Sequence, residues 1–229
     1  MITKDLQAYA DCNWTQQKDP VTNISKISDG RTSLVVSDIL LYNFDKICLS
    51  IFPSGQVPTS TDGLAITPRT IELIEFKSGF KQKITKNNFN AEVGFCKPAN
   101  KNCDAYWNLF FENQKRKIDE LISSIRLKAI ESYITLEKHV FPCCTEHIMH
   151  KQRRIILIVV IDEDGIDSLE DTLAELAEID TIQNNCFVSI KKALRRLKNQ
   201  HDASSNTYYY DSIEVMSIQE FSSYLCMPA

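Results

Sequence analysis

The sequence predicts an α/β fold in which a mixed sheet contains a three-strand meander and is crossed by one long helix. Three observations predict it. Residues 71–77 alternate apolar and charged side chains as a half-buried strand does, and residues 155–161 form the continuous apolar run of a strand covered on both faces. Between them, apolar residues recur every three or four positions over residues 105–140, which indicates a buried helical stripe.

The elements before the long helix are expected in the following order. A helix is expected near residues 4–10, although residues 1–33 are polar, rich in turns and otherwise hard to assign. Residues 34–41 are expected to contain the end of a helix. The three strands of the meander are expected at residues 47–52, 63–66 and 71–77. Residues 81–104 carry Asn, Lys, Pro and Gly and are expected to be irregular.

The long helix and the elements after it complete the prediction. Its apolar stripe consists of Ile118, Leu121, Ile122, Ile125, Ala129, Tyr133, Leu136 and Val140. Helices are expected at 168–179 and 187–199, a strand at 212–216 and a closing helix through Phe221. We expect residues 1–229 to form one domain, with the core at 34–165 and the C-terminal helices and closing strand at 166–229.

Composition fits a soluble globular protein. The chain has 229 residues, of which 43% are hydrophobic and 24% charged, so it can bury a large core. The formal net charge of −4 excludes coating of nucleic acid by bulk positive charge, and a polyanion would need a local basic patch. The N-terminal residues lack an apolar signal core and the run at 155–161 is too short to span a bilayer. A cytoplasmic location without a membrane partner is expected.

The hairpin that ends the meander has a definite register. Residues 67–70 are expected to form its turn, because Pro68 has the fixed φ that suits the second position of a β-turn. Pro68 also argues against a tight two-residue hairpin, whose turn needs positive φ. A four-residue loop that closes between Ile66 and Ile71 then sets the pairing of every residue along the two strands.

That register gathers three charged side chains. Asp62 falls opposite Glu75, which places their Cβ atoms about 5 Å apart. Lys77 lies two residues beyond Glu75 and therefore projects from the same face, whereas Glu72 points to the other face.

Two opposed carboxylates need a positive charge between them, because like charges across a ladder are destabilising. A hard divalent cation is one source of that charge. Mg²⁺ and Mn²⁺ sites that also take substrate phosphate commonly use one or two carboxylates, with water completing the shell. Beside such an ion, Lys77 could hold a phosphate oxygen or help to orient or deprotonate an attacking water.

The pattern Asp62, spacer, Glu75-Phe76-Lys77 resembles the motif of the PD-(D/E)xK nuclease superfamily. The resemblance implies a restriction-endonuclease-like core, in which a helix, a three-strand meander, a crossover helix and a further strand follow one another. It also implies metal-dependent hydrolysis of phosphodiesters, with Asp62 and Glu75 as ligands of Mg²⁺ or Mn²⁺ and Lys77 as the catalytic lysine. Members include restriction enzymes, junction resolvases and nucleases of DNA repair or phage defence.

The chain departs from the family pattern at two places. Many members carry a glutamate ligand in the first helix, but this chain has no glutamate before Glu72. Asp38 or Asp45 could substitute, and each is also readily explained as a cap or surface residue. The proline that often precedes the aspartate is replaced by Thr61.

Cysteine and histidine usage suggests a second kind of site. The eight cysteines show no paired framework, and most are expected to be buried reduced thiols. Cys143 and Cys144 are followed by His147 and His150, a grouping that zinc could use. No second pair of cysteines with knuckle spacing completes it, so a loop with buried thiols and exposed imidazoles is the competing interpretation.

Basic residues offer two places for a polyanion. Lys81, Lys83 and Lys86 follow the motif directly and are the candidates for nucleic-acid binding. A second group lies on one predicted helical face and includes Lys191, Lys192, Arg195, Arg196 and Lys198. Both groups are also compatible with solvated surfaces.

Three function classes therefore remain open. The first is a metal-dependent endo- or exonuclease in defence or DNA processing, with DNA as the expected partner and a homodimer as one open arrangement. The second is a catalytically inactive nuclease-fold interaction module, which the missing early glutamate favours. The third is a zinc-stapled nucleic-acid-binding protein. Hydrolases built on a phosphate-binding loop, a nucleophile elbow or a His-Glu-x-x-His helix are not supported, because the chain lacks those motifs.

Overall fold

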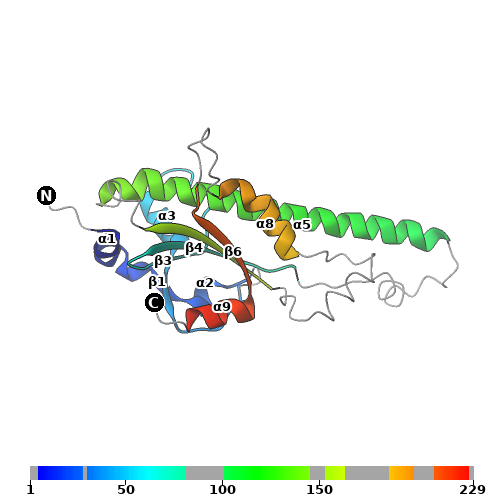
Figure 1. The fold of residues 1–229 in the computed structure, drawn as a ribbon, viewed down its shortest axis with the longest axis horizontal. Helices are drawn as coiled ribbons and strands as arrows, with labels where there is room; N and C mark the ends of the chain where they lie inside the picture. Colours follow the sequence, from blue (N-terminus) through cyan, green and yellow to red (C-terminus); the bar gives the residue numbers. More distant parts are fainter. Residues whose placement is uncertain are drawn as a thin grey trace.

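The protein is a mixed α/β structure built on one six-stranded sheet (Figure 1). The computed structural model describes residues 5–27, 30–80, 101–144, 153–162, 186–198 and 209–226. The strands lie side by side in chain order: β1 (Lys18–Pro20), β2 (Leu40–Asn43), β3 (Gly63–Ile66), β4 (Thr70–Lys77), β5 (Arg154–Ile161) and β6 (Ser212–Ser217).

The pairing of neighbouring strands changes from antiparallel to parallel at the centre of the sheet. β1, β2, β3 and β4 pair antiparallel, whereas β4, β5 and β6 pair parallel. Parallel neighbours need a crossover connection, and the connection from β4 to β5 contains the long helix α5 (Lys101–Thr135). The predicted meander, crossover helix and following strand are therefore present.

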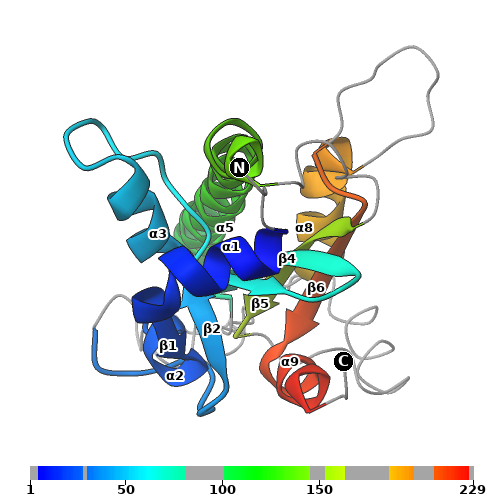
Figure 2. The ribbon, with the colours of Figure 1, turned by 90° about the vertical axis from the view of Figure 1, so that its left-hand side faces the viewer.

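Helices cover both faces of this sheet (Figure 2). In the described part of the chain the helices are α1 (Leu6–Asn13), α2 (Val21–Ile24), α3 (Phe44–Ile51), α5, α8 (Cys186–Leu194) and α9 (Ile218–Leu225). Short turns extend them: η1 (Thr15–Gln17), the π-helical η2 (Leu136–Val140) that continues α5, η3 (Phe141–Cys143) and η5 (Arg195–Leu197). α3, α5 and α8 lie on one face, and α2 and α9 lie on the other.

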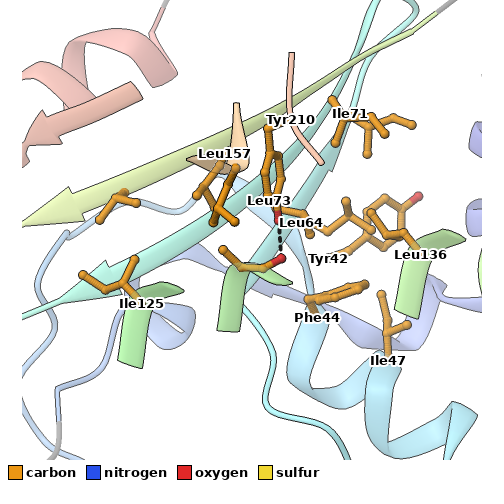
Figure 3. Close-up of a cluster of buried hydrophobic side chains, with 14 of the residues drawn as sticks. Tyr42, Phe44, Ile47, Leu64, Ile71, Leu73, Ile125, Leu136, Leu157 and Tyr210 are labelled. Carbon is orange, nitrogen blue, oxygen red and sulfur yellow. Dashed lines mark hydrogen bonds between the residues drawn. The ribbon is translucent and has the colours of Figure 1, made fainter. Parts of the chain in front are cut away.

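Two apolar clusters form the core, one on each face. The larger lies under α5, where Ile125 packs with Leu73 of β4 and Leu157 of β5 (Figure 3). The hydroxyl of buried Tyr210 donates a hydrogen bond to the carbonyl oxygen of Ala129, 2.6 Å away, so the ring is buried without an unsatisfied polar group. Residues of the predicted helical stripe are buried in this cluster or pack against it, which confirms the interpretation of residues 105–140.

The smaller cluster explains why β5 reads as a continuous apolar run. Val21 of α2 and Phe221 of α9 cover the second face, where Ile158 and Val160 of β5 are buried. Leu157 and Val159 project to the first face. A strand buried on both sides has no solvated face on which polar residues could alternate.

The β3–β4 hairpin has the predicted register. Gly63 pairs with Ile74, and Ile66 pairs with Ile71. The hydroxyl of Thr67 accepts a hydrogen bond from the amide of Thr70, 2.8 Å away, and this bond closes the four-residue turn.

The first strand of the meander was predicted at the wrong place. Residues 47–52 belong almost wholly to helix α3, because Phe44, Ile47 and Cys48 bury one helical face. The side chain of Asn43 caps this helix by accepting a hydrogen bond from the amide of Lys46. The strand is β2, seven residues earlier than expected.

The helix expected over residues 34–41 is also absent. The backbone of this segment bonds to residues 21–25 instead of to itself: the amide of Leu34 donates to the Ser25 carbonyl, and the amide of Val21 donates to the Ile39 carbonyl. An apolar stretch of this length can be read as helix or strand, and here pairing with the N-terminal segment decides.

The remaining predictions are confirmed in part. α1, α8 with η5, β6 and α9 lie close to the expected positions, and α5 begins at Lys101, inside the stretch expected to be irregular. The helix predicted at 168–179 lies outside the described residues, and the assignment of residues 1–229 to one domain stays a prediction. None of the helices in the described part of the chain combines the length and apolar character needed to cross a bilayer.

Candidate functional site

Asp62 and Glu75 converge on the ammonium group of Lys128 beneath α5. Asp62 directly precedes β3, and Glu75 lies on β4 on the face that α5 covers. The Nζ atom of Lys128 donates to Asp62 Oδ1 at 3.0 Å and to Glu75 Oε2 at 2.9 Å. The two carboxylate oxygens are therefore less than about 6 Å apart. The prediction that these side chains meet on one face is confirmed, and the positive charge between them is a lysine.

Burial makes the charges of this cluster interact strongly. The Glu75 side chain is fully buried, while those of Asp62 and Lys128 are 14% and 23% exposed. Burial raises the pKa of Glu75 well above its usual range, the charge of Asp62 adds to this rise, and Lys128 opposes it. Burial alone would lower the pKa of Lys128, but the charges of Glu75 and Asp62 outweigh it and raise that pKa. Lys128 is thus held as a cation, as a buried pair of carboxylates requires.

Lys77 lies beside this cluster, as the strand period predicts. Its Nζ atom donates to Ser124 Oγ of α5 at 3.2 Å. Asp62, Glu75, Lys77 and Lys128 line one pocket of about 270 Å³, to which Lys26 of the N-terminal segment also contributes. Three lysines and two carboxylates therefore surround one recess.

Glu72 serves the opposite face. Its carboxylate accepts hydrogen bonds from the hydroxyls of Tyr224 in α9 and Thr70, at 2.7 and 2.8 Å. This arrangement confirms that strand parity excludes Glu72 from the cluster.

A set of hydrogen bonds fixes the position of Asp62. Its Oδ2 atom accepts a bond from the backbone amide of Phe76 at 2.7 Å, and its neighbour Thr61 donates its amide to Ser132 Oγ of α5 at 2.8 Å. Two residues earlier, Thr59 binds the carboxylate of Glu131 through its amide and hydroxyl. The segment leading to Asp62 is thereby tied to α5 on one side and to β4 on the other.

The donor set fits a hard divalent cation. The second oxygen of Glu75, Oε1, is buried and has no hydrogen-bond partner among the described residues. A buried carboxylate oxygen without a partner is costly, and a cation would satisfy it. In the part of the chain that the structure describes, no three His, Cys, Asp or Glu side chains form a ligand group. Asp62 and Glu75 would therefore need water or substrate oxygens to complete a coordination shell.

The two substitute ligands lie outside this pair. Asp38 is exposed on the irregular segment before β2 and is not among the residues that line the pocket. Asp45 stands in the first turn of α3, where it accepts a hydrogen bond from Ser60. Among the described residues neither joins Asp62 and Glu75 in a ligand group of three. Asp45 is nevertheless near enough to interact with their cluster, because burial and the charge of Asp62 raise its pKa and Lys128 lowers it.

Other predicted site residues lie outside the described residues. Lys81, Lys83 and Lys86 are among these, as are His147 and His150 of the zinc hypothesis. The thiols of Cys143 and Cys144 donate to backbone carbonyls of the preceding turn, and only Cys144 is buried. The zinc site stays a prediction.

Asp162 has a structural role. Its carboxylate accepts the amides of Gly79 and Phe80, both at 2.8 Å, and so joins the ends of β4 and β5. Gly79 has a φ of 109°, a conformation that other residues rarely adopt, which lets the chain turn sharply after Lys77.

Lys128 and Ser132 are the site residues that sequence reasoning missed. Both lie on α5 at the edge of the apolar stripe, with Lys128 three positions after Ile125 and Ser132 four positions after Lys128. A lysine and a serine at helical spacing beside a buried stripe are the available signal, because the same helical face turns toward the sheet. The prediction of a positive charge between the carboxylates did not include a lysine as its source.

Comparison with protein-family models, curated proteins and solved structures gives no match. The functional assignment therefore depends on the arrangement of Asp62, Glu75, Lys77 and Lys128.

Proposed function

We propose that the protein is a metal-dependent nuclease that hydrolyses phosphodiester bonds of nucleic acid, with DNA as the expected substrate. One observation carries the proposal: the carboxylates of Asp62, just before β3, and of Glu75 on β4 meet within about 6 Å, beside a lysine that lines the same pocket. Their spacing, Asp62 followed by Glu75-x-Lys77, is that of the PD-(D/E)xK motif.

The order of the elements supports the same proposal. An antiparallel meander is followed by a crossover helix and a parallel strand, which is the order of a restriction-endonuclease-like core. The motif also falls where that core would put it, at the β3–β4 hairpin beneath α5. We infer that the protein adopts this fold, with β1 and the N-terminal helices as additions at one edge.

The residues of the pocket would act as follows. Asp62 and Glu75 would bind the ion, and the amide of Phe76 would keep Asp62 in its rotamer. Lys77 would bind a non-bridging phosphate oxygen and stabilise the negative charge that develops there, while Ser124 orients its ammonium group. Mg²⁺ or Mn²⁺, when bound, would polarise the phosphate and lower the pKa of a water molecule.

Lys128 has a distinct part in this proposal. Its ammonium group donates to one oxygen of each carboxylate, so an ion that binds both must displace the ammonium group or share the space with it. A displaced Lys128 would still line the pocket and could bind a second phosphate oxygen. Metal affinity is therefore expected to be weaker than for a pair of free carboxylates.

Cleavage of labelled nucleic acids tests the proposal. Wild-type protein with Mg²⁺ or Mn²⁺ is expected to cut at least one substrate from a panel of single-stranded, duplex and branched DNA and RNA. Lys77→Ala is expected to cut about 100-fold more slowly or worse, because it removes charge stabilisation in the transition state. It should still bind the same substrate in Ca²⁺, measured by fluorescence anisotropy.

The matched control is Lys115→Ala, which removes an exposed lysine of α5 that does not line the pocket. Its rate should stay near that of the wild type. No cleavage of any substrate by the wild type, or equal rates for the two variants, would contradict the proposal.

One observation favours a second function, an inactive nuclease-fold module that binds a partner. Lys128 forms ion pairs with both carboxylates without a metal, and the described residues offer no third acidic ligand. In that case the Asp62–Lys128–Glu75 cluster would serve stability only. Binding of nucleic acid or protein by the wild type, with neither cleavage nor Mn²⁺ binding, would identify the protein as such an inactive module.

A further inference from the structure

A second recess lies on the opposite side of α5 from the carboxylate pocket. It has a volume of about 560 Å³, and its walls come from α5 and from the α8–η5 segment, residues 186–197. Figure 2 shows α8 on the side of α5 away from α3. We call this recess the α5–α8 groove, and its lining residues are Asp119, Ile122, Ser123, Arg126, Lys192, Ala193 and Arg196.

Three cations, one from α5 and two from the α8–η5 segment, converge there. Arg126 belongs to α5, whereas Lys192 and Arg196 come from α8 and η5, and all three are exposed. Asp119 is the one carboxylate among the lining residues. The groove therefore carries a net positive charge in a chain whose formal net charge is −4.

The sequence of the α8–η5 segment explains why positive charge gathers at the groove. Ile190, Leu194 and Leu197 are buried in the core. Its charged positions are then forced outward, and residues 186–198 contain five Lys or Arg and no acidic residue. Balancing acidic side chains, expected from a merely solvated face, are absent from this stretch of sequence.

We propose that the α5–α8 groove binds the phosphodiester backbone of a nucleic acid. Arg126 and Arg196 can each bind a phosphate through two parallel hydrogen bonds, and Lys192 adds a point charge. Contacts to phosphate oxygens carry no sequence information, so binding through the backbone is expected to be independent of sequence. The inference extends the proposed nuclease function by naming where a long substrate is held outside the carboxylate pocket.

The geometry favours nucleic acid over a membrane surface. A helix that lies on a bilayer places its apolar face among the lipids. Among the side chains of α8 and η5 that the structure describes, the large apolar ones, Ile190, Leu194 and Leu197, are buried against the core. They are therefore not available to enter a lipid layer, and the exposed cations beside them fit a strand of phosphates better than a sheet of headgroups.

The two recesses are close enough for one substrate. Both are lined by the same stretch of α5, residues 121–128 on one side and 119–126 on the other. A helix with its side chains is about 10–12 Å wide, so a strand that passes over α5 could reach both within a few nucleotides. Short fragments bound only at the carboxylate pocket would not reach the groove.

Binding measurements without cleavage test the proposal. A fluorescein-labelled DNA duplex, single strand or RNA is titrated with protein in Ca²⁺ or EDTA, and the dependence of affinity on salt is recorded. The variant is Arg126→Gln/Lys192→Gln/Arg196→Gln. It should bind about 10–100-fold more weakly and lose about 2–3 from the slope of log affinity against log salt, because three phosphate contacts vanish.

The control variant is Lys117→Gln/Lys191→Gln/Arg195→Gln. It removes the same charge from exposed positions of α5 and of the α8–η5 segment that do not line the groove. Thermal unfolding of both variants should match the wild type. Should one triple variant unfold early, Arg196→Glu alone supplies the test and should weaken binding more than Arg195→Glu.

The outcomes separate this inference from the proposed function. A loss of nucleic-acid affinity in the groove variant but not in the control variant supports the inference. It does so even if the wild type cuts no substrate, a result that overturns only the nuclease proposal. Equal losses of nucleic-acid affinity in the two triple variants would overturn the inference, even if cleavage depends on Lys77. Binding of phosphatidylserine vesicles with no binding of nucleic acid would also overturn it.

Discussion

Lys128 is the residue on which the charge balance of the candidate site depends. It is the partner of two carboxylates, one of them fully buried, and removing one partner of a buried ion pair costs about 3 kcal/mol. Lys128→Met should therefore lower the melting temperature by about 6–12 °C for a chain of this size. Mn²⁺ should restore part of the loss, because a bound cation replaces the missing ammonium group. Thermal unfolding with and without Mn²⁺ measures both effects.

A double-mutant cycle gives the control for this prediction. In the Asp62→Asn/Glu75→Gln background, Lys128→Met should lower the melting temperature only slightly, since no carboxylate remains for the lysine to pair with. The same loss in both backgrounds would mean that the lysine stabilises the fold through the packing of its aliphatic stem alone.

At the scale of elements, the site is held by the attachment of the segment before β3 to α5. The amide of Thr61 and the hydroxyl of Ser132 are both buried, so removing the hydroxyl leaves an amide without a partner. Ser132→Ala should cost about 1–3 kcal/mol in denaturant unfolding. Ser123→Ala is the matched control, because Ser123 is exposed and bonds only within its own helix. Equal stabilities of the two variants would show that this attachment is unimportant.

The contact of α1 with the edge of the sheet predicts a pH dependence. A hydrogen bond from Tyr42, aided by Gln7 and Lys18, lowers the pKa of Asp11 to about 2 from its ordinary value near 3.8. A depressed pKa adds stability above the unfolded value, and that stability disappears as the pH falls through the folded value. The melting temperature of the wild type should therefore exceed that of Asp11→Asn at pH 5. This difference in melting temperature should disappear between about pH 4 and 2. A gap that stays constant to pH 2 would exclude this contribution from Asp11.

Some elements of the chain could be predicted from the sequence and others could not. The hairpin register was predictable because Pro68 restricts the turn and a side-chain period of two fixes the faces. The segment before Asp62 was not, since apolar residues at 47–52 suit a strand as well as a helix. The spacing of Phe44, Ile47 and Cys48 was the signal for α3.

Lys128 could not be placed from sequence for a related reason. Strand pairing fixes the relation of Asp62 to Glu75 through a short hairpin, whereas the rotation and translation of α5 over the sheet depend on packing of the whole stripe. Two carboxylates predicted to be opposed indicate a cation but do not say which atom supplies it.

The whole molecule distributes charge unevenly around α5. The carboxylate pocket and the α5–α8 groove lie on its two sides, each lined by three Lys or Arg residues, although the chain as a whole is acidic. Such local patches attract a polyanion at short range, within a Debye length of about 10 Å at 0.1 M salt. Binding of nucleic acid should therefore weaken steeply as salt rises.

The central claim is that Asp62 and Glu75 bind a divalent cation, and a titration with Mn²⁺ followed by electron paramagnetic resonance of the free ion tests it most directly. The wild type should remove Mn²⁺ from solution and Asp62→Asn should not. Glu120→Gln, which changes an exposed carboxylate of α5 that does not line the pocket, should bind as the wild type does. Lys128→Met should bind more tightly, because the ion no longer competes with an ammonium group. Equal uptake of Mn²⁺ by the wild type and Asp62→Asn, or no uptake by the wild type, would contradict the claim.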